Sequence, residues 1–153
     1  MKKNKVLVLG IDALDPRVVQ KLDLPNLKRL NFNKLETTIP PQSPVAWSAA
    51  ATGCSPEKFG VFDFIKRDTK NYLPMLSIID EKKGLLKTKY KSPLKKPPVS
   101  KIINKKNLSS TVIRWPLTFP AEKIKGKMLS GLGTLDIQGK LNSHSFYTDE
   151  KKR

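Results

Sequence analysis

Cysteine and histidine are almost absent from this chain of 153 residues, which contains one of each, Cys54 and His144. A single cysteine excludes an internal disulfide framework and any metal site built from several cysteines. Long apolar runs are also missing, since no stretch approaches the ~20 residues that a membrane-spanning helix needs. We therefore expect a cytoplasmic protein in a reducing compartment, with no membrane partner.

Acidic residues are scarce as well. The chain has 13 Asp plus Glu against 30 Lys plus Arg, a formal charge of +17. Such a field attracts anions in general, including phosphate esters, nucleic acid and acidic lipid head groups, and does not determine a fold. Most of the cations are lysines, which lack the planar fork used for bidentate recognition, so we interpret the excess mainly as solvated surface.

What the sequence does contain is an alternation of short apolar runs and helical patterns. Lys5–Ile11 is a continuous aliphatic run, typical of a strand buried on both faces of a parallel sheet. Helices are expected over Pro16–Leu22, with Asp15 as cap, and from just after Ser43 to Gly53. Further strands are expected at Leu35–Ile39, Leu73–Ile79, Ser110–Trp115 and Lys127–Ser130. This order predicts a single α/β domain over residues 1–153, with a largely parallel sheet flanked by helices.

Residues 81–106 differ in character from the rest of the chain. They hold ten lysines, one acid (Glu81) and three prolines, with no clear period of a strand or a helix. We expect an exposed basic loop or insertion there. An alternative is that this segment binds polyanions such as nucleic acid, although Tyr90 alone gives little aromatic surface for stacking on bases.

Asp12 is the first residue whose position suggests chemistry. It directly follows the Lys5–Ile11 run, and ligands of open α/β sheets bind at the carboxyl ends of strands. A carboxylate there is either a ligand for a hard cation or simply a helix cap.

Ser43 is the second such residue. It follows a Pro-Pro turn and opens a helix of small residues, where the positive end of the helix dipole and free backbone N–H groups hold an anionic phosphoryl group. A divalent cation would lower the pKa of its hydroxyl and allow nucleophilic attack near neutral pH. The alternative is that Ser43 only caps the helix. A serine–histidine–acid triad is unsupported, because His144 lies far away in a polar tail.

Three segments carry a resemblance to a known family. They are Val6–Pro16 (VLVLGIDALDP), Pro40–Gly53 (PPQSPVAWSAAATG) and Ser55–Phe64 (SPEKFGVFDF), and the later stretches Trp115–Pro120 and Lys127–Gly133 agree with them. Together they resemble the opening of type I phosphodiesterase/nucleotide pyrophosphatase proteins of the alkaline phosphatase superfamily, from residue 5 to about 148.

The resemblance implies an alkaline-phosphatase-like fold and a phosphoric ester hydrolase. By this resemblance Asp12 corresponds to a metal-ligating aspartate, and Ser43 to a Ser/Thr nucleophile that also touches a metal. Two divalent cations, commonly zinc, would assist attack on a phosphate ester, with a phosphoseryl intermediate that water hydrolyses.

Two departures from the family pattern matter. Phe59 stands where the family often has a histidine, so any role of that ring is absent. The family's other metal ligands are aspartates and histidines of a C-terminal half, whereas zinc needs about four ligands per ion and this chain has one histidine. We therefore expect an N-terminal portion, incomplete at the C-terminal side and inactive without a complementary C-terminal polypeptide. The alternatives are a non-catalytic polyanion-binding protein and a decayed gene fragment.

Overall fold

The computed structural model describes residues 4–31, 33–85 and 88–134, and these divide into two units between Glu36 and Thr37. The first unit contains two short helices, α1 (Pro16–Lys21) and α2 (Pro25–Lys28). The Asp15 carboxylate caps α1 by accepting a hydrogen bond of 2.7 Å from the Arg17 backbone N–H, and Pro16 occupies the first helical position. The prediction of a capped helix here is confirmed.

The run Lys5–Ile11 is not a strand in the structure. It has no strand assignment, and the side chains of Val6 and Leu7 are 86% and 90% exposed. A strand requires a neighbour that pairs with its N–H and C=O groups, and no strand of the described residues pairs with this run. The expected strand at Leu35–Ile39 is wrong for the same reason.

The second unit begins with α3 (Ser43–Thr52), followed by the single turn of α4 (Pro56–Phe59). Gly53 closes α3 in the left-handed conformation, with φ of 64°, and its N–H donates to the Ala49 carbonyl at 2.8 Å. Glycine suits this position because a β-carbon strains the left-handed backbone. The predicted helix is therefore confirmed to within one residue at each end.

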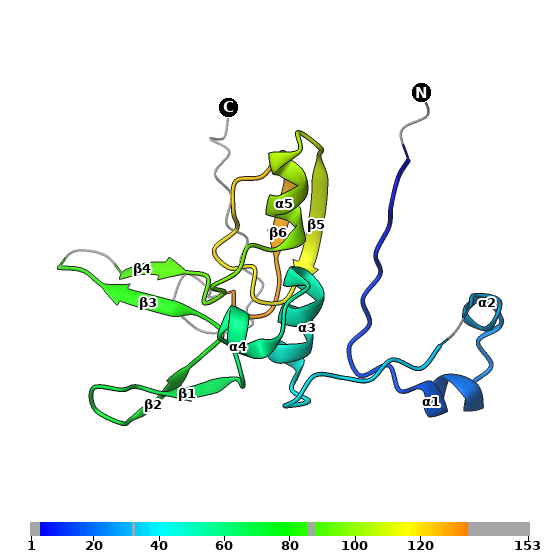
Figure 1. The fold of residues 1–153 in the computed structure, drawn as a ribbon, viewed down its shortest axis with the longest axis horizontal. Helices are drawn as coiled ribbons and strands as arrows, with labels where there is room; N and C mark the ends of the chain where they lie inside the picture. The colour runs from blue at the N-terminus through cyan, green and yellow to red at the C-terminus, as the bar shows by residue number, and fades with distance from the viewer. Residues whose placement is uncertain (1–3, 32, 86–87, 135–153) are drawn as a thin grey trace. The chain divides into compact units, whose positions relative to one another are not determined.

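Three two-stranded sheets follow in the described part of this unit (Figure 1). The first two are antiparallel hairpins, β1–β2 (Ile65–Arg67 and Pro74–Leu76) and β3–β4 (Asp80–Lys83 and Thr88–Lys91). The third pairs β5 (Ser110–Trp115) with β6 (Gly126–Ser130) in parallel, with an irregularity between Ile113 and Trp115. The α/β class is thus confirmed, but the expectation of a largely parallel sheet is not, since one sheet of the three is parallel.

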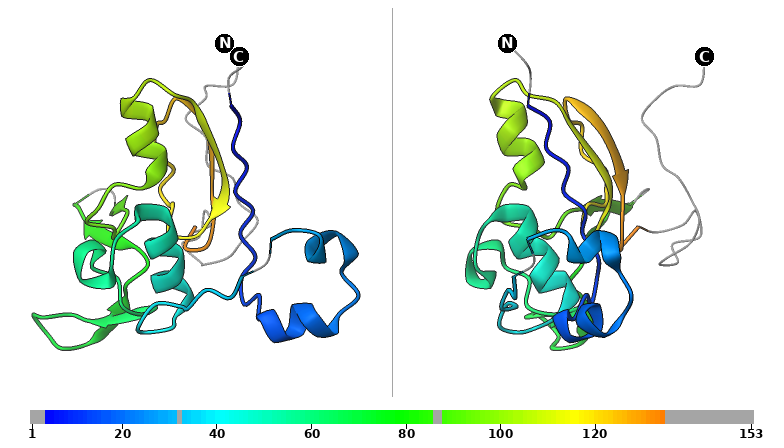
Figure 2. Two further views of the ribbon diagram at one scale, coloured as in Figure 1. Left: turned by 45° about the vertical axis from the view of Figure 1, so that its right-hand side comes forward. Right: turned by 90° about the vertical axis from the view of Figure 1, so that its right-hand side faces the viewer.

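The basic segment 81–106 contains regular structure in place of the expected loop. It supplies the end of β3, all of β4 and the helix α5 (Val99–Lys105). Figure 2 shows α5 alongside the β5–β6 pair, and residues of both elements line a common cavity. The lysine-rich composition did not predict these strands and this helix, because they depend on a few apolar side chains, among them Tyr90.

The core of the second unit lies between α3, α4 and the loops that follow β2 and β5. It consists of buried side chains at Val45, Phe59, Val61, Ile78 and Leu117, all at most 4% exposed. A smaller cluster of Ile79 and Phe119 continues toward β4. No helix of the described ranges is both long and apolar enough to cross a bilayer.

Candidate functional site

Ser43 occupies the first turn of α3, and its position is set by a buried anchor. The two residues that follow it, Pro44 and Val45, are among the most completely buried side chains of the chain, and Val45 belongs to the core with Phe59. The Ser43 residue itself is half-buried at the edge of this core. Burial of the two following residues anchors the start of α3, and with it the backbone position of Ser43.

The backbone conformation before α3 shows which residue is the N-cap of this helix. The N-cap of α3 is Gln42, in an extended conformation with φ of −106° and ψ of 142°, and Ser43 is the first residue of the helix. The reading of Ser43 as the N-cap is therefore wrong by one position. Pro44 follows at the second position, where its missing N–H costs nothing.

The helix start offers fewer backbone donors than the sequence suggested. The N–H groups of Val45 and Ala46 both donate to the Gln42 carbonyl, at 3.0 and 2.9 Å, and Pro44 has no N–H. An anion beside Ser43 would thus meet the positive end of the helix dipole and not a cradle of several N–H groups. The backbone N–H groups at this helix start therefore contribute less to holding a phosphoryl group than the sequence predicted.

Two hydroxyls farther along α3 serve the helix itself. The Ser48 hydroxyl donates to the Pro44 carbonyl at 2.5 Å, and the Thr52 hydroxyl donates to the Ser48 carbonyl at 2.7 Å. Both residues are buried, and a polar group away from water needs such a partner. These hydroxyls are structural.

A tryptophan pair joins α3 to β5. The rings of Trp47 and Trp115 meet edge to face, with centroids 5.0 Å apart and an interplanar angle of 86°. The Trp115 indole N–H also donates to the Trp47 carbonyl at 3.2 Å. This contact joins residues far apart in sequence and holds α3 against the parallel strand pair.

Phe59 is wholly buried beneath α3, at 0% exposure, in contact with the core. Its ring is a packing element of this core.

Asp12 lies in an exposed turn of the first unit, next to Ala13, whose φ is +54°. Asp12 and Ser43 thus belong to different units, and their joint use of one cation stays a prediction.

The described residues do not fit a zinc site. Among residues 4–31, 33–85 and 88–134, no three His, Cys, Asp or Glu side chains are grouped so as to hold a metal ion. Asp12 and Ser43 together provide two donor residues, while zinc takes about four ligands. His144 falls outside the described ranges.

A cavity that sequence reasoning missed lies between α5 and the β5–β6 pair. It has a volume of about 70 Å³, and its lining is mostly apolar, with Val112, Leu117 and Met128 among its residues. Glu122 also lines it. One carboxylate oxygen of Glu122 pairs with the Lys101 ammonium at 2.7 Å, and the other is buried without a hydrogen-bond partner in the described structure. No pattern in the sequence singles out this glutamate.

Comparison with known proteins gives one family. The sequence profile described as "Type I phosphodiesterase / nucleotide pyrophosphatase" matches residues 6–151. No curated protein and no solved structure matches the chain.

Proposed function

Because the chain belongs to the type I phosphodiesterase/nucleotide pyrophosphatase family, we propose that it supplies the nucleophile-bearing part of a phosphoester hydrolase. Membership of this family indicates that the substrates are phosphate esters and that the reaction is hydrolysis of a phosphodiester or pyrophosphate bond. The proposed nucleophile is the Ser43 hydroxyl.

The observation that carries this proposal is the placement of Ser43 at the first residue of a ten-residue helix, directly before the fully buried Pro44 and Val45. In the proposed reaction the Ser43 oxygen forms a bond to phosphorus and loses its proton to solvent. The bond from phosphorus to the leaving oxygen breaks, and that oxygen takes up a proton. Water then hydrolyses the phosphoserine and regenerates the hydroxyl. The positive end of the α3 dipole favours the charge that accumulates beside Ser43.

Asp12 is the proposed metal-ligating residue of this chain, together with Ser43. Since the described residues do not complete a zinc coordination shell, we propose that a complementary polypeptide provides the remaining ligands of a divalent cation. Activity of this chain by itself is then not expected.

The test is a hydrolysis assay with bis(p-nitrophenyl) phosphate and added Zn²⁺ or Mn²⁺. The full chain is assayed alone and after mixing with the polypeptide encoded immediately downstream. We expect no turnover from the chain alone and metal-dependent turnover from the mixture. A mixture with no activity above the blank would refute the enzymatic role.

Matched variants test the nucleophile itself. Ser43→Ala should reduce turnover of the mixture to the blank, and Ser43→Thr should retain part of it, since it keeps a hydroxyl at the same place. Ser109→Ala is the control, because Ser109 is an exposed serine just before β5 and its loss should leave the rate unchanged. Full activity of Ser43→Ala would show that another group attacks phosphorus.

A further inference from the structure

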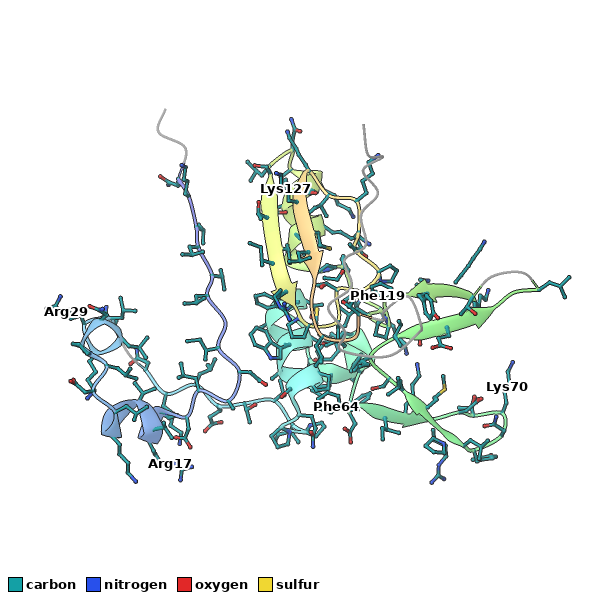
Figure 3. All side chains as sticks on the ribbon, turned by 180° about the vertical axis from the view of Figure 1, so that it is seen from behind. Arg17, Arg29, Phe64, Lys70, Phe119 and Lys127 are labelled. Carbon is teal, nitrogen blue, oxygen red and sulfur yellow. The ribbon has the colours of Figure 1, made fainter. Side chains whose placement is uncertain are left out.

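The β3–β4 hairpin extends away from α3 and α4 and is anchored at its base (Figure 1). Tyr90 on β4 is half-buried, and its ring centroid lies 5.9 Å from that of Phe119. Both rings belong to the small cluster around Ile79, which is 2% exposed and immediately precedes β3. The position of Phe119 beside the base of the hairpin is seen in Figure 3. The hairpin is therefore fastened to the core by an aromatic contact.

One face of this hairpin is basic. Lys82 lies directly opposite Lys89, and Asp80 lies opposite Lys91. Directly opposite residues share a face, with β-carbons about 4.5–5.5 Å apart, and like charges in that arrangement repel. The single acid of this face, Asp80, is already paired with the Lys66 ammonium at 2.6 Å. The three lysines of this face, Lys82, Lys89 and Lys91, are exposed, and Asp80 is the one acid that shares the face with them.

The described part of the turn after β3 contains an exposed leucine. Leu85 follows Gly84 at the end of β3, and its side chain is fully exposed, at 105% of the reference area. The hairpin thus presents an exposed apolar side chain, Leu85, beside exposed lysines of the same element, and this pairing of apolar and cationic groups is typical of segments that bind at a membrane interface.

Nucleic acid does not explain this combination. The hairpin, residues 80–91, contains no arginine for reading bases. Its one aromatic ring, Tyr90, is packed on Phe119 and is not presented for stacking on bases. Phosphate contacts alone would use the lysines and leave the exposed leucine without a role.

We propose that the β3–β4 hairpin binds the surface of a membrane that contains anionic phospholipid. Lys82, Lys89 and Lys91 face the negatively charged head groups, and Leu85 enters the boundary between head groups and acyl chains. This contact requires no membrane-spanning segment, so it agrees with the absence of such a helix among the described residues, but it replaces the expectation from the sequence that the protein has no membrane partner. It uses none of the residues proposed for hydrolysis. It would hold the protein at a surface where phosphate-ester lipids and their head groups are concentrated.

The experiment is co-sedimentation of the full chain with large vesicles. One set consists of phosphatidylcholine alone, and in the other roughly a third of the lipid is phosphatidylserine. We expect binding to the anionic vesicles only. Lys82→Thr/Lys89→Thr should weaken it by about fivefold for each lysine. The control is Lys70→Thr/Lys127→Thr, which removes the same charge from exposed positions outside this hairpin (labelled in Figure 3) and should bind almost like the parent.

Insertion of the tip needs its own readout. Since Cys54 is the one cysteine of the chain, a Cys54→Ser/Leu85→Cys variant can carry a single environment-sensitive fluorophore at the turn. A blue shift of its emission on addition of anionic vesicles would support the proposal. Equal sedimentation of the two lysine variants would overturn it, as would an unshifted emission. Binding to duplex DNA without binding to vesicles would overturn it in favour of a nucleic-acid partner. Thermal unfolding of each variant would show that the fold is retained.

Discussion

Substitution of Phe59 by alanine tests the central claim that the core beneath α3 holds Ser43 in place. Phe59 is 0% exposed and packs with Val45, Val61, Ile78 and Leu117. Burial of a phenylalanine side chain stabilises a fold by about 1.5–3 kcal/mol, and the cavity left by truncation raises the cost of Phe→Ala to about 3–5 kcal/mol. Domains of this size are stable by about 5–15 kcal/mol in total. The variant should therefore lose a large part of its free energy of unfolding.

The chain contains its own control for this substitution. Phe62 lies three residues later, and its side chain is 51% exposed. Phe62 buries only about half of its side chain, and its truncation leaves no closed cavity. Phe62→Ala should therefore lower the free energy of unfolding by about 1 kcal/mol.

The measurement is urea unfolding followed by tryptophan fluorescence, since the contact between Trp47 on α3 and Trp115 on β5 belongs to the same unit and is lost on unfolding. With a loss of about 4 kcal/mol and an m-value of about 2 kcal/mol/M, the midpoint of Phe59→Ala should fall by about 2 M at unchanged slope. Equal midpoints for Phe59→Ala and Phe62→Ala would refute the assignment of Phe59 to the core, and with it the anchoring of α3.

Three further predictions follow from backbone geometry, charge and composition. Gly126→Ala should destabilise the fold far more than Gly53→Ala, because a β-carbon at Gly126 would lie 1.8 Å from the Ser110 carbonyl oxygen, whereas nothing lies within 4 Å of a β-carbon at Gly53. Thermal unfolding of the two variants would measure this difference. Equal melting temperatures would contradict the β5–β6 register. Hydrogen bonds from Arg17 lower the pKa of Asp15 below its ordinary value of 3.8. The stabilisation that these hydrogen bonds give α1 is thus complete above pH 3.8 and is lost as the pH falls through the lowered pKa of Asp15. Arg17→Ala should return the pKa of Asp15 toward 3.8 in an NMR titration. An unchanged pKa would contradict the ion pair between the two side chains. Calorimetric titration of the chain alone with Zn²⁺ should show no tight site, since the described residues lack a group of three ligands; a tight, saturable site would show that this chain completes its own coordination shell.

The candidate nucleophile was predictable because its signals are local. Pro44 near the start, a run of small residues and Gly53 at the end determine α3 from within ten residues of sequence. What could not be predicted was the hydrogen bonding at its start, where the Gln42 carbonyl takes the N–H groups of Val45 and Ala46. The competition among these donors depends on backbone geometry that composition does not specify.

The basic segment shows the opposite outcome. Its lysines pointed to a loop, yet β3, β4 and α5 form within or beside it. The strands are stabilised by pairing with each other and by the packing of Tyr90 on Phe119, a residue 29 positions later in the chain. β-structure depends more on such contacts than on the preference of single residues.

The sequence alone determined the elements whose causes lie within a few residues: the Asp15 cap of α1, the helix from Ser43 to its glycine end, and the strand at Ser110–Trp115. Its motifs also determined the family. The tertiary structure alone decided which apolar runs become strands and which lysines share a face, because hydrogen-bonding partners and opposite neighbours come from distant parts of the chain. It also decided that Phe59 is a core residue, since burial depends on what packs around a side chain and not on its place in a motif.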